Sequence, residues 1–185
     1  MLKQWLQWAF EDATLPDVVW TKDGRYFDPF RPSVEPSDFA SPDENYRSRA
    51  ECLTAIRAAV TTSDVFVFTL GLTEAWWDKD LAVEYAICPG TVAGSFDRHT
   101  HIFRNWGHED INNDLTDALE LMHKHNPSIR ILLTVSPVPL VATASDNHVV
   151  VATMHSKSIL RAVAGQQASR DWIDYFPSYE IFASP

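Results

Sequence analysis

The sequence predicts a single α/β domain built around a mainly parallel sheet. Two short runs, at residues 64–72 and 130–135, are apolar at nearly every position, which is typical of strands covered on both faces. Amphipathic segments come before, between and after these runs, and a third strand-like run follows at 171–176. Such an alternation of helices and buried strands indicates an α/β domain. The length of 185 residues fits one domain better than two.

The first segment, residues 1–10, predicts an amphipathic helix, because Lys3, Gln4 and Gln7 interrupt its apolar positions. The same interruptions exclude the apolar core of a signal peptide. Residues 28–42 hold four of the eleven prolines, and so many fixed φ angles exclude a helix or a central strand. Because this segment is also rich in aromatic residues, we expect an ordered loop.

A helix is predicted to begin directly after this loop. Ser41 suits the N-cap, Pro42 suits the first helical position, and Glu44 completes a capping box. Apolar residues then recur every three to four positions, at Tyr46, Ala50, Leu53, Ile56 and Val60. The strand at 64–72 follows.

The second half of the chain repeats the helix and strand pattern. We expect a helix at 107–126, ended by Asn126, Pro127 and Ser128, and then the strand at 130–135. A third helix is predicted at about 148–164, with Gly165 as its C-cap. The strand at 171–176 completes the pattern.

Composition and charge exclude several classes of protein. Hydrophobic residues make up 45% of the chain, which is not a disordered composition. The formal net charge of -10 repels phosphate backbones, so we expect no binding to nucleic acid. No apolar run has the roughly 20 residues of a membrane span, so no membrane partner is expected. Cys52 and Cys88 form no paired motif and are interpreted as reduced thiols of a cytoplasmic protein.

Polar residues follow the predicted strands at the edge where parallel α/β sheets usually bind ligands. Gly71 ends the first strand, and its backbone N–H can point outward to a ligand. Thr73 and Glu74 add a hydroxyl and a carboxylate. The alternative is a turn in which Thr73 and Glu74 cap the next segment, with Trp76 and Trp77 serving only for packing.

The segment after the second strand offers Ser136 and His148. Ser136 is a poor candidate nucleophile, because Pro137 after it has no N–H to stabilise an oxyanion. A structural turn, or a loop that floors a pocket, is the other interpretation. His148 begins the third helix, where it can either contact a ligand or cap the helix.

A metal site at His99, His101 and His108 is conceivable, although solvated histidines are the simpler interpretation. The chain has no GxGxxG, no P-loop and no GxSxG motif. We therefore predict no cofactor.

Five strings resemble the GSCFA-domain family, which is itself similar to SGNH or GDSL-type esterases. They are RYFDPFRPSVEP at 25–36, FVFTLGLTEAWWD at 66–78, FRNW at 103–106, LLTVSPVPLVATASDNHVVVATMHSKSILRA at 132–162 and DYFPSYEIF at 174–182. The resemblance covers nearly the whole chain. It implies a flavodoxin-like three-layer α/β/α sandwich, and hydrolysis or transfer of an acyl group on an ester of a small molecule or a glycan.

The resemblance also implies that two catalytic groups of the family are absent from residues 1–185. The family nucleophile is the Ser of a Gly-Ser-Cys-Phe-Ala motif, and the base is a His beyond the YFPSYEI string. Neither stands in residues 1–185, so we expect an incomplete, inactive domain. Gly71 N–H and Thr73 are then candidate oxyanion contacts, Glu74 supports them, and Asn105 is an alternative donor. The predicted substrate-binding residues are Trp77, Ser136 and His148.

Two further expectations follow. The absence of a first, central strand predicts exposed strand edges, and therefore marginal stability or self-association. Two other functions remain open: a non-catalytic carbohydrate-binding or scaffold protein in which Trp76 and Trp77 stack on sugar, and a metal-dependent hydrolase built on the three histidines.

Overall fold

The computed structural model describes residues 1–11, 13–35 and 38–183. The chain divides into two compact units. The first unit is Met1–Ala58 with Ala75–Arg104, and the second is Ala59–Glu74 with Asn105–Pro185. Each unit is therefore assembled from two separate stretches of chain. The single domain stays a prediction.

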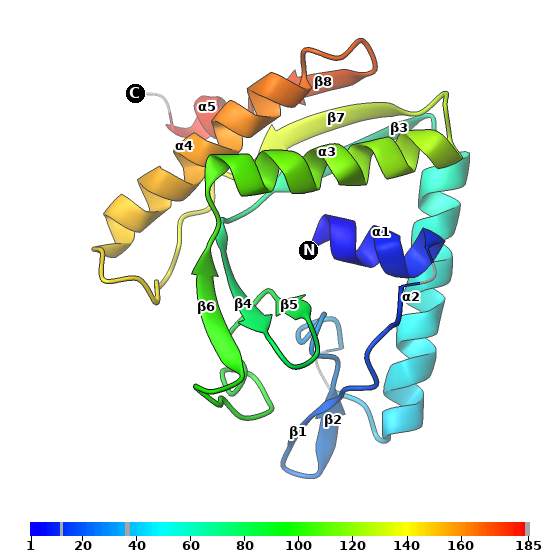
Figure 1. Ribbon diagram of the computed structural model, residues 1–185, viewed down its shortest axis with the longest axis vertical. Coiled ribbons are helices and arrows are strands. Elements are labelled where there is room, and N and C mark those ends of the chain that lie inside the picture. Colours follow the sequence, from blue (N-terminus) through cyan, green and yellow to red (C-terminus); the bar gives the residue numbers. More distant parts are fainter. Residues whose placement is uncertain (12, 36–37, 184–185) are drawn as a thin grey trace. The chain divides into compact units, whose positions relative to one another are not determined.

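The second unit contains the predicted parallel sheet. Its strand order is β3-β7-β8, and both neighbouring pairs are parallel. The strands are β3 (Val65–Leu70), β7 (Arg130–Val135) and β8 (Ile173–Phe176), and the helices are α3 (His108–His125), α4 (Val149–Gln167) and α5 (Ser178–Ala183). Helix α4 packs on β7 and β8, and α3 packs on α4 (Figure 1). An α/β fold with a mainly parallel sheet is thus confirmed for this unit.

Strand β3 departs from the prediction that both faces are covered. Val65 is 55% exposed and Val67 is 60% exposed, whereas Leu70 is buried. Because side chains alternate along a strand, Val65 and Val67 share one face, and that face has little cover in the described part of the chain. The apolar run predicted the strand itself correctly but not the covering of both its faces. In contrast, β7 is buried at four of its six residues.

The helices α3 and α4 begin where the sequence predicts. Helix α3 ends at His125, and the Asn126 side chain donates hydrogen bonds to the carbonyl oxygens of Val60 at 3.0 Å and Ser63 at 2.9 Å. The prediction that Gly165 caps α4 is wrong, because the helix continues to Gln167. Buried Gln167 donates to Asn112 and Thr116 of α3, each at 2.8 Å, and these bonds hold the last turn in helical form.

The first unit contains helices and antiparallel strands. They are α1 (Leu2–Phe10), β1 (Trp20–Lys22), β2 (Arg25–Phe27), α2 (Pro42–Thr62), β4 (Glu74–Asp78), β5 (Val83–Tyr85) and β6 (His101–Asn105). Three of these elements extend into the second unit, because Ala59, Glu74 and Asn105 belong to that unit. The strands form a β1-β2 hairpin and a sheet of order β5-β4-β6. Neither of these was predicted.

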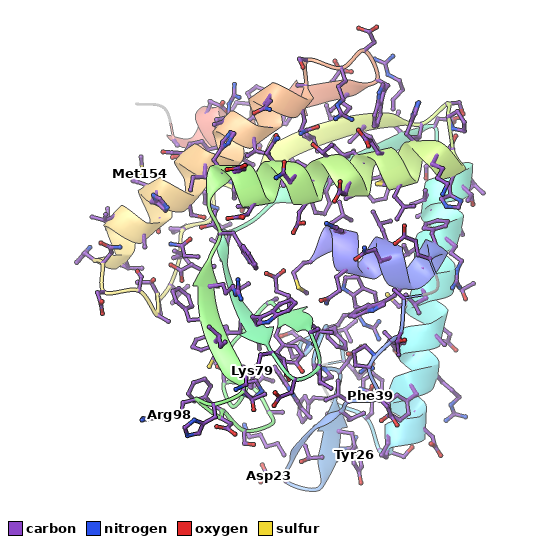
Figure 2. All side chains as sticks on the ribbon, in the orientation of Figure 1. Asp23, Tyr26, Phe39, Lys79, Arg98 and Met154 are labelled. Atoms are coloured by element: carbon purple, nitrogen blue, oxygen red, sulfur yellow. The ribbon has the colours of Figure 1, made fainter. Side chains whose placement is uncertain are left out.

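The hairpin turns at Asp23 and Gly24, which have φ angles of 51° and 75° (Figure 2 labels Asp23 at the tip). Two successive positive φ values are the requirement of a type I′ turn, which matches the twist of paired strands. Tyr26 of this hairpin is bridged to Phe39, and the two backbones exchange hydrogen bonds of 3.1 and 2.8 Å. The proline-rich segment is therefore ordered where it is described. Its residues 36 and 37 lie outside the described residues.

A buried ion pair fixes this segment to α2. The Asp28 carboxylate accepts from Arg49 at 3.0 Å, and both side chains are almost completely buried. Arg49 also donates to the carbonyl oxygens of Pro16 and Val18. At the start of α2, Ser41 accepts from the Glu44 N–H at 3.2 Å, as the capping box predicts. The Glu44 carboxylate accepts instead from the N–H of Ala40, one residue before the expected position.

In the ranges 1–11, 13–35 and 38–183, none of the helices combines the length and apolar composition that a bilayer crossing demands.

Candidate functional site at the carboxyl end of β3

The 71–73 turn connects β3 to β4 and lies at the carboxyl end of the parallel sheet. Gly71 is exposed, and a Cβ atom added there would meet nothing within 4 Å. Space is therefore open beside its backbone. Among the described residues, no hydrogen-bond acceptor is paired with the Gly71 N–H. Its contact with an oxyanion stays a prediction.

Thr73 is the most enclosed residue of the 71–73 turn, with 1% of its surface exposed. Its N–H donates to the Ser156 hydroxyl at 3.0 Å, and its carbonyl accepts from the Trp106 N–H at 2.9 Å. Its hydroxyl donates to Asn105 Oδ1 at 2.6 Å. Because these polar groups are already bonded inside the second unit, the geometry favours Thr73 as a support for other groups rather than as a donor to a ligand.

Asn105, the alternative donor in the sequence, is the exposed partner of Thr73. The Thr73 hydroxyl donates to Asn105 Oδ1 and so orients the plane of the amide, and in the described part of the chain Nδ2 has no hydrogen-bond acceptor. An amide NH₂ that is oriented before a ligand arrives loses little entropy when it donates a hydrogen bond. Gly71 N–H and Asn105 Nδ2 are therefore two donors that this region offers.

Helix α4 supplies two contacts to the 71–73 turn. Ser156 accepts from the Thr73 N–H, and Lys157 Nζ donates to the Gly71 carbonyl at 2.7 Å. Lys157 is 1% exposed, and burial lowers the pKa of its ammonium group below the usual value. Sequence reasoning assigned no role to either residue. A signal was present, because Ser156 lies four residues after Ala152 and four before Leu160, on the stripe that faces the sheet.

Glu74 joins the 71–73 turn to the segment after β7. Its carboxylate accepts from the Thr143 hydroxyl at 2.6 Å, and the Thr143 and Ser145 hydroxyls are 2.8 Å apart. This bond ties the segment between β7 and α4 to the start of β4, and the supporting role of Glu74 at an oxyanion site stays a prediction.

Ser136 and His148 both make local structural bonds. The Ser136 hydroxyl accepts from the Val138 N–H at 3.2 Å, and the Ser136 N–H donates to the Leu70 carbonyl at 2.9 Å. In the described part of the chain no histidine is hydrogen-bonded to Ser136. His148 Nδ1 accepts from the Val150 N–H at 3.2 Å and caps α4. Their roles in substrate binding stay predictions.

Trp77 belongs to the first unit, where the Arg104 guanidinium lies 5.5 Å from the centre of its ring. Trp76 packs edge-on against Phe96, with ring centres 5.4 Å apart. These contacts leave the carbohydrate-stacking alternative untested. The role of Trp77 in substrate binding stays a prediction.

The histidines proposed as metal ligands make other contacts. His101 Nδ1 accepts from the Asp97 N–H at 3.0 Å, and its Nε2 is 3.7 Å from the Asp78 carboxylate. Asp78 also accepts from the Tyr85 hydroxyl at 3.1 Å, and burial together with this carboxylate strongly raises the pKa of Tyr85. Over the described ranges, no three His, Cys, Asp or Glu side chains are grouped to hold a metal ion.

Comparison with known proteins identifies one family. The model of the GSCFA family matches residues 1–185, the whole chain, and so confirms the resemblance seen in the sequence strings. No curated protein matches the chain, and no solved structure matches it.

Proposed function

Because the chain belongs to the GSCFA family, we propose that its second unit carries the oxyanion-binding part of an SGNH-like acyl esterase or O-acyltransferase. The proposal includes a flavodoxin-like three-layer α/β/α sandwich as the fold. The proposed substrate is an ester, and esters of carbohydrates are one class of such substrates. The observation that carries it is the bond from the Thr73 hydroxyl to Asn105 Oδ1, because it leaves the amide NH₂ of Asn105 as a fixed donor.

Acyl transfer places negative charge on the carbonyl oxygen of the ester. A nucleophilic hydroxyl gives its proton to the general base while its oxygen bonds to the carbonyl carbon, and the electron pair of the carbonyl double bond moves to the carbonyl oxygen. When that pair returns, the bond to the leaving oxygen breaks and this oxygen takes the proton from the protonated base. Two donors on the carbonyl oxygen stabilise the intermediate, and one such donor is worth about a hundredfold or more in rate. Gly71 N–H and Asn105 Nδ2 fit this role.

The nucleophile and the base are assigned to the family motifs that residues 1–185 do not contain. Ser136 is a poor substitute, since its hydroxyl is engaged with Val138 and has no histidine partner in the described chain. The purified chain should therefore bind an ester analogue without turning over an ester. Incubation with a fluorophosphonate and measurement of intact mass should give no adduct, whereas a family member that carries the Gly-Ser-Cys-Phe-Ala motif should gain one.

The binding itself can be tested by NMR on the ¹⁵N-labelled chain. The probe is ethyl methylphosphonate, a singly charged tetrahedral anion that resembles the intermediate of ester hydrolysis. We expect saturable shifts of the Gly71 amide and of the Asn105 side-chain NH₂. Asn105→Asp replaces the donor with a negative acceptor, so it should abolish these shifts.

Asn113→Asp is the matched control, because Asn113 is an exposed residue of α3 and the substitution makes the same change in charge. The control should bind as the unmodified chain does. Binding by Asn105→Asp with unchanged affinity would contradict the proposal, and so would shifts confined to residues away from Gly71 and Asn105.

A further inference from the structure

Two neighbouring residues of α4 hold the 71–73 turn from the inside. Ser156 accepts from the Thr73 N–H at 3.0 Å, and Lys157 donates to the Gly71 carbonyl at 2.7 Å. One contact holds the N–H of Thr73 at the end of the turn, and the other holds the carbonyl of Gly71 at its start. Neither end of the turn can rotate without breaking one of them.

The ammonium group of Lys157 is an unusual group to find in this place. It is 1% exposed, and in the described part of the chain the Gly71 carbonyl is its hydrogen-bond acceptor while no carboxylate lies within ion-pair distance. Burial of a charge without an opposite charge costs free energy, and burial accordingly lowers the pKa of this group. A methionine would fill the same space without that cost. Packing alone therefore does not explain a lysine at this position.

We infer that Lys157 and Ser156 are positioning residues of the proposed oxyanion site, and that the charge of Lys157 makes the site selective for anionic oxygen. This inference rests on the proposed function for the identity of the ligand. The contacts to Gly71 and Thr73 fix the turn, and the Thr73 hydroxyl passes that order on to the Asn105 amide.

The charge acts on the ligand through space. The Gly71 carbonyl that accepts from the ammonium and the Gly71 N–H belong to the same residue, on either side of its Cα. Since the surroundings of Lys157 exclude water, its attraction for an anion is screened less than that of a surface lysine. The charge should therefore strengthen the binding of two kinds of ligand. One is an ester whose carbonyl oxygen gains negative charge during the reaction, and the other is a carboxylate or phosphonate, whose oxygens carry negative charge already.

The test uses NMR spectra of the whole ¹⁵N-labelled chain with and without ethyl methylphosphonate. Lys157→Met keeps the length of the side chain and removes the charge, whereas Lys157→Arg keeps the charge. Ser156→Ala removes only a hydroxyl. The controls are Lys124→Met on α3 and Ser158→Ala on α4, which make the same changes at exposed residues.

In Lys157→Met and in Ser156→Ala, the side-chain NH₂ signals of Asn105 should move, although in the described part of the chain no hydrogen bond joins Asn105 to either residue. Affinity for the phosphonate should fall about tenfold in Lys157→Met, and less in Lys157→Arg because the charge is retained. The two controls should leave the Asn105 signals and the affinity unchanged. A role in folding alone would not move the Asn105 signals of a folded variant.

The inference is overturned if both variants fold and their Asn105 and Gly71 signals match those of the unmodified chain. If Lys157→Met does not fold, Ser156→Ala decides the question by the same signals. Failure of the proposed function gives a different result: the unmodified chain binds no phosphonate at Gly71 and Asn105, while the Asn105 signals still respond to Lys157 and Ser156.

Discussion

The buried hydroxyl of Thr73 donates to the exposed amide of Asn105 across 2.6 Å, from a residue 32 positions earlier in the chain. The pair joins the start of β4 to the end of β6 within the second unit. An exposed side chain normally samples several rotamers, and this bond holds one of them. The order of a group at the surface therefore depends on a group in the interior.

Thr73→Val tests this dependence, because valine has nearly the shape of threonine without its hydroxyl. We expect the free energy of unfolding to fall by about 1 kcal/mol, since a buried hydrogen bond is lost. The two Asn105 NH₂ signals should move toward those of a free amide in NMR spectra. Thr73→Ser keeps the hydroxyl and should preserve them. Identical Asn105 signals in the valine and serine variants would show that the bond does not orient the amide.

The buried charge of Lys157 predicts a pH-dependent stability. Because burial lowers its pKa in the folded chain, the unfolded chain binds more protons between that lowered pKa and the ordinary value of 10.5. The free energy of unfolding of the unmodified chain should therefore rise through this window relative to that of Lys157→Met. Below that window, where the ammonium is charged in the folded and the unfolded chain, the methionine variant should be equally stable or more stable by about 1 kcal/mol.

Urea unfolding at pH 7 and pH 10 measures this difference. A difference between the two chains that is constant with pH would mean that Lys157 titrates alike in the folded and unfolded states.

The Asp28 and Arg49 pair predicts a large effect on stability. Asp28→Asn leaves a buried guanidinium without its opposite charge, and breaking such a pair costs about 3–5 kcal/mol. Asp174→Asn is the control, because Asp174 pairs with Arg130 at the surface, 3.2 Å away, and such pairs contribute about 1 kcal/mol or less. Urea unfolding of both variants should separate these values. Equal losses would contradict the difference in burial.

The exposed face of β3 predicts self-association. Strand β3 pairs only with β7 in the described sheet, so its other edge has free backbone groups, and Val67 beside that edge is 60% exposed. Sedimentation velocity should show association that increases with concentration. Val67→Lys should reduce it, because a charge at an edge strand opposes pairing. Val141→Lys, at a 96% exposed loop position, should not. A monomer at every concentration would contradict this prediction.

Local patterns predicted much of the second unit. The apolar run of β7 was predicted to the residue, and the Asn126, Pro127 and Ser128 signal correctly ended α3. The hydrophobicity of β3 could not show which face of the strand is covered by other elements. The same apolar run is found in strands that are covered on one face and in strands that are covered on both. The hairpin was missed although Asp23 and Gly24 form a strong turn signal, because the flanking strands have only three residues each.

The site was only partly predictable for a different reason. Gly71 was predicted as a donor from its place at the end of a strand, and Asn105 was named as an alternative donor within the family resemblance. The bond between Thr73 and Ser156 spans 83 residues, and that between Lys157 and Gly71 spans 86. No local pattern encodes such a distant pairing. Sequence reasoning therefore found candidate donors but not the residues that hold them.

The division of each unit into two stretches of chain has a consequence during synthesis on the ribosome. Residues of β3 leave the exit tunnel about 60 residues before β7, the only strand that pairs with them in the described sheet. At a translation rate of about 5–20 residues per second, that interval lasts roughly 3 to 12 seconds. For this time the nascent chain exposes Val65, Phe66, Val67 and Phe68 with both edges unpaired. This segment is therefore the one that a ribosome-associated chaperone would be expected to hold until translation has passed β7.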